Sequence, residues 1–563
     1  MDNIRLMLAL SLGAVLFLIY QAWVQDYGPG LTQQPPSASE QPSALPSPED
    51  VAAPADAPDA PAPTTPVAAN AASIADPDIS DTTANLITIE TDLLRAKIST
   101  VGGTIQSMWL KDYAANANRP GEKFQLLKPQ TPNMFIAQSG LLGGADVDIP
   151  NHKAVFTAEK QSFALADGTD SLTVELRWTS DAGIDVIKRY RFERGSYLIH
   201  AEQEVLNNSA TPLAIRDYDQ LQRTELYDPE KSSFIHTYTG AVYYGPETKY
   251  KKESFGDIAK QPLDIKIVDG WVAMIQHYFM AAWIPPAQSE QTFYTKAVDG
   301  QRFIIGMYSP TVAVPPGDNH VFTSRLFAGP KLQDALAQIT PGLELAVDYG
   351  WLTVIAEPIF WLLNKIHSLV GNWGWAIIIL TILIKLAFYK LSETSYKSMA
   401  NMRKLAPRMQ ALKDRYGDDK ERMNQAMMEM YKKEKINPLG GCLPILVQIP
   451  VFIALYWVLL ESVELRHAPF ILWLDNLTAP DPYYVLPLIM GVSMFVQQKL
   501  NPPPPDPIQA KILMALPFVF TVFFAFFPSG LVLYWTVNQL LSIAQQGYIT
   551  HRIEKAEAAK RSN

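Results

Sequence analysis

The stretch AIIILTILIKLAF, Ala376 to Phe388, decides the fold because it is almost entirely apolar yet carries one cation, Lys385. With its flanks it forms the run 373–391, and a helix that crosses a bilayer needs roughly 17 to 25 apolar residues. A lysine inside such a run costs about 3 kcal/mol, so it normally faces water, protein or a polar cavity. Alternatively, Lys385 reaches the headgroups along its own stem, since Lys390 follows closely. Spacing leaves both interpretations equally open.

Other apolar runs of similar length occur at the start of the chain and after residue 440. The first ends in the bulky Tyr20 and Trp23 rather than in small residues, which indicates an anchor that is not cleaved. Together with the lysine-bearing run they predict six membrane-spanning helices. These are residues 4–23, 373–391, 440–460, 483–498, 508–527 and 529–549.

Charge predicts the orientation of these helices. Residues 24–350 hold 25 Lys and Arg against 40 Asp and Glu. Since the whole chain has 47 and 56, the remainder holds 22 basic and 16 acidic residues. The segment 392–438 and the tail 550–563 are basic and should lie in the cytoplasm. Six crossings then place residues 1–3, the loop 499–507 and both termini inside, and the acidic middle with the loop 461–482 in the periplasm. An acidic domain argues against nucleic acid as its partner.

The soluble middle consists of two regions that differ in composition and in hydrophobic pattern. Residues 24–85 are rich in Pro, Ala, Ser and Thr, which predicts a disordered linker. Residues 86–344 alternate apolar and polar side chains in short segments separated by turn residues, which predicts a large antiparallel β-sandwich. Examples are Leu86 to Ile89, Leu172 to Leu176, Tyr197 to Ala201 and Arg302 to Ile305.

Residues 345–371 repeat apolar side chains at helical spacing, including Leu352, Ile355, Ile359, Leu363 and Ile366. This pattern predicts an amphipathic helix on the membrane surface. A helix packed on the sandwich is the alternative.

The basic segment 392–438 alternates charged residues with methionines, and Gly417-Asp418-Asp419 predicts a break that makes it a helical hairpin. Flexible thioethers suit a surface that accepts varied apolar partners. The alternative, that they only hold the two helices together, carries equal weight. The candidate contact residues are Met399, Met402, Met409, Met423 and Met427.

Enzyme motifs are not found: there is no zinc-binding His-Glu-x-x-His, no Gly-x-Ser-x-Gly elbow and no phosphate-binding loop. The single cysteine, Cys442, excludes an internal disulfide and a cysteine-based zinc site. We therefore expect no catalytic residues, no metal and no cofactor.

Several motifs in the second half resemble the bacterial YidC insertases, relatives of the mitochondrial Oxa and chloroplast Alb insertases. They keep their order from about Trp351 to the tail. The motifs are Gly371 to Gly374, Tyr396 to Arg403, Asn437 to Pro444, Ser462 to Arg466, Asp481 to Tyr484 and Phe527 to Trp535.

The resemblance implies five core helices around a hydrophilic groove, open to the cytoplasm and lipid, in which a cation attracts acidic residues of a substrate. The expected groove residues are Lys385, Thr381, Gln448, Tyr534 and Trp535. The family usually has arginine where this chain has Lys385, and tyrosine is common where it has Trp535. The charge is therefore kept, while bidentate recognition is lost.

The resemblance further implies a membrane protein insertase and chaperone of the bacterial inner membrane, with a periplasmic β-supersandwich similar to galactose mutarotases. The expected partners are nascent integral membrane proteins, membrane lipids, Sec translocon components, and the ribosome and signal recognition particle receptor at the cytoplasmic face. Two alternatives remain: a channel or transporter, and a tethered carbohydrate-active enzyme.

Overall fold

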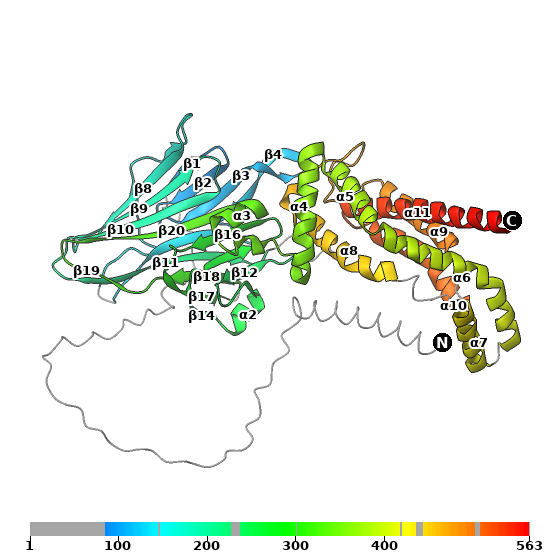
Figure 1. Ribbon diagram of the computed structural model, residues 1–563. Coiled ribbons are helices and arrows are strands. Elements are labelled where there is room, and N and C mark those ends of the chain that lie inside the picture. Colours follow the sequence, from blue (N-terminus) through cyan, green and yellow to red (C-terminus); the bar gives the residue numbers. More distant parts are fainter. Residues whose placement is uncertain are drawn as a thin grey trace, which may run out of the picture. The chain divides into compact units, whose positions relative to one another are not determined.

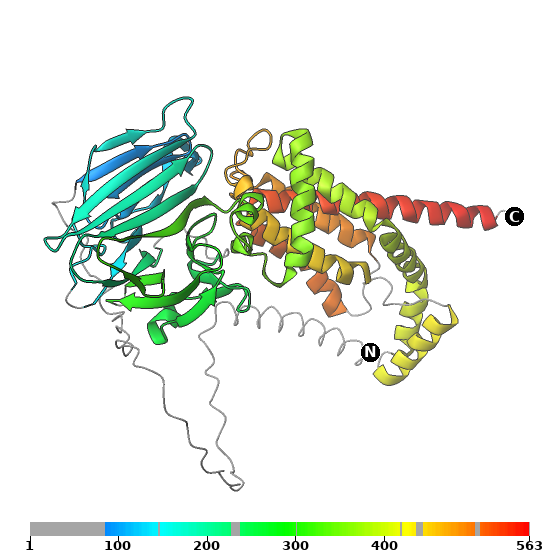
Figure 2. The same ribbon diagram turned by 60° about the vertical axis from the view of Figure 1, so that its left-hand side comes forward.

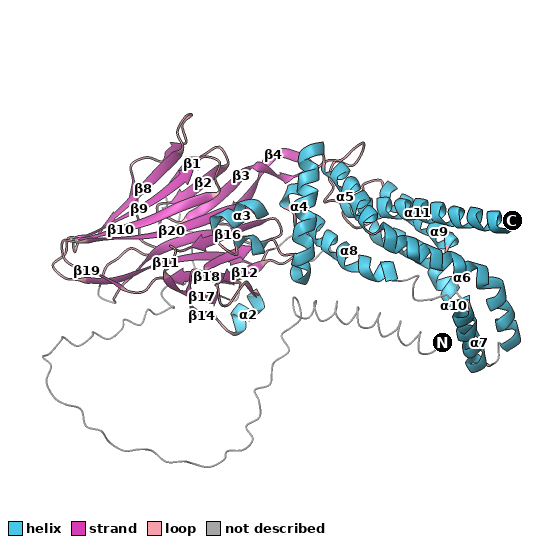
Figure 3. Cartoon of the chain, viewed as in Figure 1, coloured by secondary structure: helices cyan, strands magenta, loops and turns pink. Residues whose placement is uncertain are grey.

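The computed structural model describes residues 85–144, 147–226, 237–299, 301–416, 419–434, 443–501 and 507–561. The predicted first span, residues 4–23, and the predicted linker as far as residue 84 lie outside the described residues. Strands fill the first part of the described chain and helices fill the second (Figure 3). The predicted β-sandwich followed by a helical region is therefore confirmed.

The sandwich consists of an 11-stranded and a 9-stranded sheet, seen as two layers in Figures 1 and 2. Neighbouring strands are antiparallel except β1 and β7, which pair in parallel. The first sheet holds β1 (Leu86–Glu90), β2 (Leu94–Ser99), β3 (Ile105–Asn116), β4 (Arg119–Leu127), β5 (Phe135–Leu142), β7 (Ser162–Ala164), β11 (Leu213–Thr224), β14 (Asp264–Val268), β17 (Glu290–Val298), β18 (Arg302–Tyr308) and β19 (Val312–Val314). The second holds β6 (Thr157–Ala158), β8 (Ser171–Thr179), β9 (Ile184–Glu193), β10 (Leu198–Asn207), β12 (Gly240–Tyr244), β13 (Lys251–Glu253), β15 (Trp271–Ile275), β16 (Phe279–Ile284) and β20 (Asn319–Pro330).

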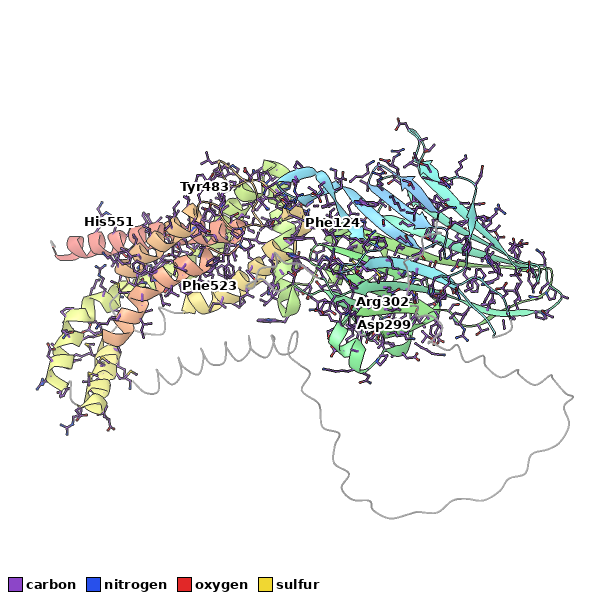
Figure 4. The ribbon with its side chains drawn as sticks, turned by 180° about the vertical axis from the view of Figure 1, so that it is seen from behind. Phe124, Asp299, Arg302, Tyr483, Phe523 and His551 are labelled. Carbon is purple, nitrogen blue, oxygen red and sulfur yellow. The ribbon has the colours of Figure 1, made fainter. Side chains whose placement is uncertain are left out.

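Alternation of buried and partly exposed side chains explains the sandwich. Strand β10 switches between the two along its whole length, as expected where one face of a sheet meets the core. Trp283 is 1% exposed, and its indole N–H donates to the Gln220 carbonyl oxygen of the facing sheet at 3.1 Å. At the surface, Arg302 and Asp299, labelled in Figure 4, pair at 2.6 Å where β17 turns into β18. Short helix α2 (Phe255–Lys260) lies in the same domain.

The chain leaves the sandwich through α3 (Gln333–Ile339) and two 3-10 turns, η2 (Leu343–Ala346) and η3 (Gly350–Leu352). The predicted helix from residue 345 therefore begins only at Thr353, as α4 (Thr353–Val370). Gly350, with φ of 61°, marks the turn that interrupts a continuous helix.

Helix α4 has apolar side chains on two faces. Ala356, Phe360 and Leu363 are buried, and the helix packs against α5 (Trp373–Ala387) and α8 (Leu443–Glu461). A second apolar stripe remains exposed. It consists of Trp351 just before the helix and of Val354, Trp361 and Leu369.

The remaining helices are α6 (Tyr389–Tyr416), α7 (Lys420–Lys433), α9 (Val485–Leu500), α10 (Pro507–Phe524) and α11 (Ser529–Arg561), with a 3-10 turn η5 (Val463–Leu465) after α8. Among the described residues, no helix by itself is long and apolar enough to pass for a membrane span. Helix α5 and the part of α6 from Tyr389 to Leu405 meet that criterion as a pair bent by 67°.

The loop between α8 and α9 lies over the ends of α5 and α11. Backbone hydrogen bonds join Ser529 N to Ala479 O at 2.7 Å and Gly530 N to Leu477 O at 2.8 Å. Gly374 in α5 lies directly under Phe470 of this loop: a Cβ atom there would come within 2.0 Å of the Phe470 ring. Any other residue at 374 would displace the loop.

The side chain of Asp481 fastens this loop to α9. Asp481 is 1% exposed; one carboxylate oxygen accepts from the Trp473 indole N–H at 2.9 Å and the Tyr483 N–H at 3.0 Å. The other oxygen accepts from the Leu486 N–H at 2.7 Å. Since Leu486 lies in the first turn of α9, Asp481 satisfies a donor that the helix itself leaves without a partner.

Residues of this loop also contact the sandwich. The Arg466 guanidinium lies 5.4 Å from the Phe124 ring centroid and 5.3 Å from that of Phe279, in cation–π geometry, and donates to Ala115 O at 3.3 Å. Val463 belongs to the same apolar core as the sandwich. The sandwich and the α8–α9 loop thus share a packed boundary.

Glu464 gives this boundary a dependence on pH. Burial, together with the charge of Asp334, raises the pKa of Glu464 to about 7. A carboxyl group whose pKa is higher in the folded than in the unfolded state stabilises the fold at low pH, and this contribution disappears as the pH rises through about 7. We expect the unfolding temperature of the full chain in detergent to fall more between pH 5.5 and 8.5 than that of Glu464→Gln. Identical pH profiles would contradict this account.

Contacts divide the chain into two compact units, of which the larger, Val67–Ala400 and Leu439–Asn563, contains the sandwich, the start of α6 and every helix named above except α7. Residues Asn401–Pro438 belong to the smaller unit and are described by themselves. There α6 ends at Tyr416 and α7 begins at Lys420, capped by the Asp419 carboxylate on Arg422 N at 3.1 Å. The two helices thus lie on either side of the predicted break, of which residues 417 and 418 lie outside the described residues.

Candidate functional site

A cavity of about 420 Å³ lies among helices α5, α6, α8, α9, α10 and α11 of the larger unit. Amide and hydroxyl groups and one ammonium group share its wall with aromatic and aliphatic side chains, so it combines a polar and an apolar side. The lining residues are Lys385, Ser392, Ser395, Tyr396, Met399, Gln448, Ile449, Phe452, Met494, Gln497, Gln498, Asn501, Leu513, Leu516, Pro517, Phe520, Tyr534, Trp535, Asn538, Gln539 and Ser542.

Lys385 contributes the ammonium group of this wall. Its Nζ donates to the Ser542 hydroxyl at 2.7 Å, and that hydroxyl donates in turn to the Asn538 carbonyl oxygen at 2.7 Å. Within the described part of the chain no carboxylate pairs with Lys385, and the neutral Ser542 hydroxyl is its hydrogen-bond partner. An ammonium group without a counter-ion in apolar surroundings attracts anionic groups strongly.

Amide side chains continue the polar wall on the neighbouring helices. Gln448 of α8 donates to the Asn538 side-chain oxygen of α11 at 3.1 Å, and Gln497 of α9 donates to that of Gln546 at 2.6 Å. Of the amides that line the cavity, Gln497 has an Oε1 atom that is buried without a hydrogen-bond partner among the described residues. Polar atoms of this kind are rare in folded proteins and are normally satisfied by water or a ligand.

Aromatic rings also line the cavity. Phe452 of α8 stacks on Tyr534 at 5.9 Å between centroids and lies 4.7 Å from the Trp535 ring. Phe520 and Phe524 of α10 contact the same Trp535 ring, at 6.4 and 4.1 Å. These rings fix α8, α10 and α11 against one another.

Five of the residues expected from sequence line this cavity together: Lys385, Gln448, Tyr534, Trp535 and Met399. Thr381 does not. It is 1% exposed and donates its hydroxyl to Ile377 O of its own helix at 2.7 Å, although it lies one turn from Lys385.

Sequence reasoning missed Ser542, the direct partner of Lys385. The spacing of polar residues in this helix could have revealed Ser542, because residues that lie three, four and seven positions after a given residue share its face of the helix. Trp535, Asn538, Gln539 and Ser542 follow this spacing, and all four line the cavity.

The other expected methionines, Met402, Met409, Met423 and Met427, lie in the smaller unit. Met427 is 6% exposed, and Met409 accepts a hydrogen bond from the Tyr431 hydroxyl at 3.2 Å, from one helix of the hairpin to the other. Arg408 and Glu434 pair at 2.7 Å between the same helices. Met409 and Met427 thus contribute to packing within the hairpin, whereas Met428 is 44% exposed.

Comparison with known proteins defines the class. The family model of the YidC periplasmic domain matches residues 86–362, and that of the 60Kd inner membrane protein matches residues 365–557. The two matched ranges define an inner-membrane protein with a large periplasmic domain.

Individual relatives narrow this class to one family. The membrane protein insertase YidC of Thioalkalivibrio sulfidiphilus is 53% identical, with 99% of each chain covered. That of Methylococcus capsulatus is 51% identical over 99% of this chain and 100% of its own. A solved structure of an active YidC insertase covers 82% of this chain and 92% of its own, with 16% identity and a TM-score of 0.37. The chain belongs to the YidC family of membrane protein insertases.

Proposed function

We propose that this chain inserts and folds integral membrane proteins in the bacterial inner membrane, and that its cavity receives the hydrophilic part of each substrate. The observation that carries the proposal is the Lys385 ammonium group, which lines the cavity and donates to the neutral Ser542 hydroxyl, with no carboxylate partner among the described residues. This activity makes and breaks no covalent bond.

In the proposed topology six helices cross the membrane: residues 4–23 first, and then the spans that contain α5, α8, α9, α10 and the first part of α11. Both termini, the hairpin 392–438 and the basic tail 550–563 lie in the cytoplasm, while residues 24–344 and the loop 461–482 lie in the periplasm. The abundance of Lys and Arg in the hairpin and tail supports this orientation. The exposed stripe of α4 with Trp351, Val354 and Trp361 supports an interfacial position for residues 345–371.

In the proposed mechanism, a substrate carboxylate enters the cavity and pairs with Lys385, while the apolar helix of the substrate slides along α8 and α10 into lipid. The cavity lowers the cost of carrying polar groups into the membrane because its amides and hydroxyls replace water. The exposed apolar side chains of α10, including Phe518, Val519 and Val522, suit contact with the apolar helix of the substrate.

Partners at each face follow from the same proposal. The cytoplasmic hairpin, with exposed Met428, contacts nascent chains, the ribosome or the signal recognition particle receptor, and membrane lipids surround the helices. The activity operates both alone and together with Sec translocon components.

Insertion into liposomes tests this function directly. The purified full chain should protect from protease the short acidic translocated segment of a small membrane protein, well above the level in empty liposomes. Added Sec components then measure the share that depends on them. A correctly folded chain that gives no protection but conducts a solute selectively would replace the insertase by a channel or transporter.

A further inference from the structure

The boundary between the sandwich and the helices contains a buried ion pair. Lys331 Nζ and a Glu461 carboxylate oxygen are 3.2 Å apart, with side chains 2% and 5% exposed. Lys331 directly follows the last residue of β20, and Glu461 is the last residue of α8. The pair therefore joins the end of a central sandwich strand to the end of a helix that lines the cavity.

Glu461 is an unfavourable residue at this position by itself. The C-terminal end of a helix carries a partial negative charge, so a buried carboxylate there is repelled by its own helix. Burial adds a desolvation cost that only a close counter-ion offsets. Lys331 supplies that counter-ion, and its Nζ also donates to Ala346 O at 3.2 Å, which holds the ammonium group in place.

Two further contacts hold the same helix end against other parts of the sandwich. His277, in the turn between β15 and β16, lies with Nε2 2.9 Å from Leu460 O. Arg466, in the turn just after α8, lies 5.4 and 5.3 Å from the centroids of Phe124 on β4 and Phe279 on β16, whose rings stack on each other. The end of α8 and the turn that follows it thus meet the sandwich at three places, which restrains the direction of the helix as well as its position.

The other end of α8 carries Gln448, Ile449 and Phe452 of the cavity wall. At 1.5 Å per residue, Gln448 lies about 20 Å along the helix from Glu461. A small tilt at the fixed end would therefore move the cavity wall by a larger distance.

We infer that Lys331 and Glu461 are positioning residues, through which the β-domain sets the direction of α8 and with it the width of the substrate cavity. The inference rests on the proposed function only for its effect on insertion. The geometry of α8 can be measured whether or not the chain inserts anything.

The test uses the full chain with Cys442→Ser and spin labels on cysteines placed at Val447 of α8 and Leu540 of α11, both exposed. Lys331→Glu places two carboxylates at the joint, so the distance between the labels should shift or broaden by about 2 Å or more. Insertion of the acidic test substrate should fall about fivefold or more. The exposed pair Lys266–Glu290 of the sandwich provides the matched control, since Lys266→Glu should change neither quantity.

A compensated variant separates positioning from general damage to the fold. Lys331→Met combined with Glu461→Leu removes both charges and keeps the packing, so it should restore the distance and most of the insertion. Three results would overturn the inference: an unchanged distance in Lys331→Glu, a changed distance with full insertion, or no recovery in the compensated variant. If the parent chain inserts nothing but the distances follow this pattern, the proposed function fails and the positioning role stands.

Discussion

Replacing Lys385 by glutamate should abolish insertion of substrates whose translocated segments are acidic. The change places an anion in a wall where, among the described residues, the Ser542 hydroxyl is the hydrogen-bond partner of residue 385, so the attraction for a substrate carboxylate becomes repulsion. Loss of about 2 to 3 kcal/mol of interaction free energy at this contact corresponds to a decrease of about 30- to 150-fold in insertion of the acidic substrate. Protease protection in liposomes measures the amount inserted.

Two variants show whether charge is the cause. Lys385→Arg keeps the cation and should retain most activity, and the activity of Lys385→Gln should lie between the two. The amount inserted of substrates with neutral translocated segments should differ less among these variants. Equal insertion of the acidic substrate by all forms would remove Lys385 from the mechanism.

Asp481→Ala should cause the largest loss of stability among single changes in the α8–α9 loop. The alanine leaves the Trp473 indole N–H and the Tyr483 and Leu486 backbone N–H groups without their buried acceptor. Hydrogen bonds to a charged acceptor contribute about 1.5 to 3 kcal/mol each and are not additive, so a total loss of about 3 kcal/mol or more is expected. Thermal unfolding in detergent reports this loss.

Asp475, an exposed carboxylate of the same loop, provides the control: Asp475→Ala should change stability by less than about 0.5 kcal/mol. Asp481→Asn retains one acceptor oxygen and should cost less than Asp481→Ala. If the Asp481→Ala and Asp475→Ala variants unfold at the same temperature, the stability of the loop does not depend on the Asp481 carboxylate.

Local patterns in the sequence predicted most of the architecture. The alternation at Leu172 to Leu176 became part of β8, where buried side chains alternate with less buried ones. Arg302 to Ile305 became the start of β18, a strand that is buried on both faces. The glycine and aspartates at 417–419 lie between α6 and α7, as their composition predicted. Gly350 shows where such reasoning failed: its turn shortened the helix predicted from residue 345, since the apolar spacing continued through residues that are not helical.

The cavity was harder to predict because it depends on how helices converge. Lys385 was recognised as unusual, but only the packing of α5 beside α11 shows that the Ser542 hydroxyl accepts its hydrogen bond. Thr381 lies on a neighbouring turn of the same helix and still bonds its own backbone. The Lys331–Glu461 pair joins residues 130 positions apart, and neither has a local pattern that indicates the other.

The close approach of Gly374 to Phe470 has a consequence for evolution. Because a Cβ atom at 374 would come within 2.0 Å of the Phe470 ring, residue 374 cannot gain a side chain while that ring stays in place. Among relatives, alanine or serine at 374 should occur together with a smaller side chain at 470, and glycine should prevail wherever the ring is kept. Natural variation at these two positions thus records whether distant lineages close this end of the helices in the same way.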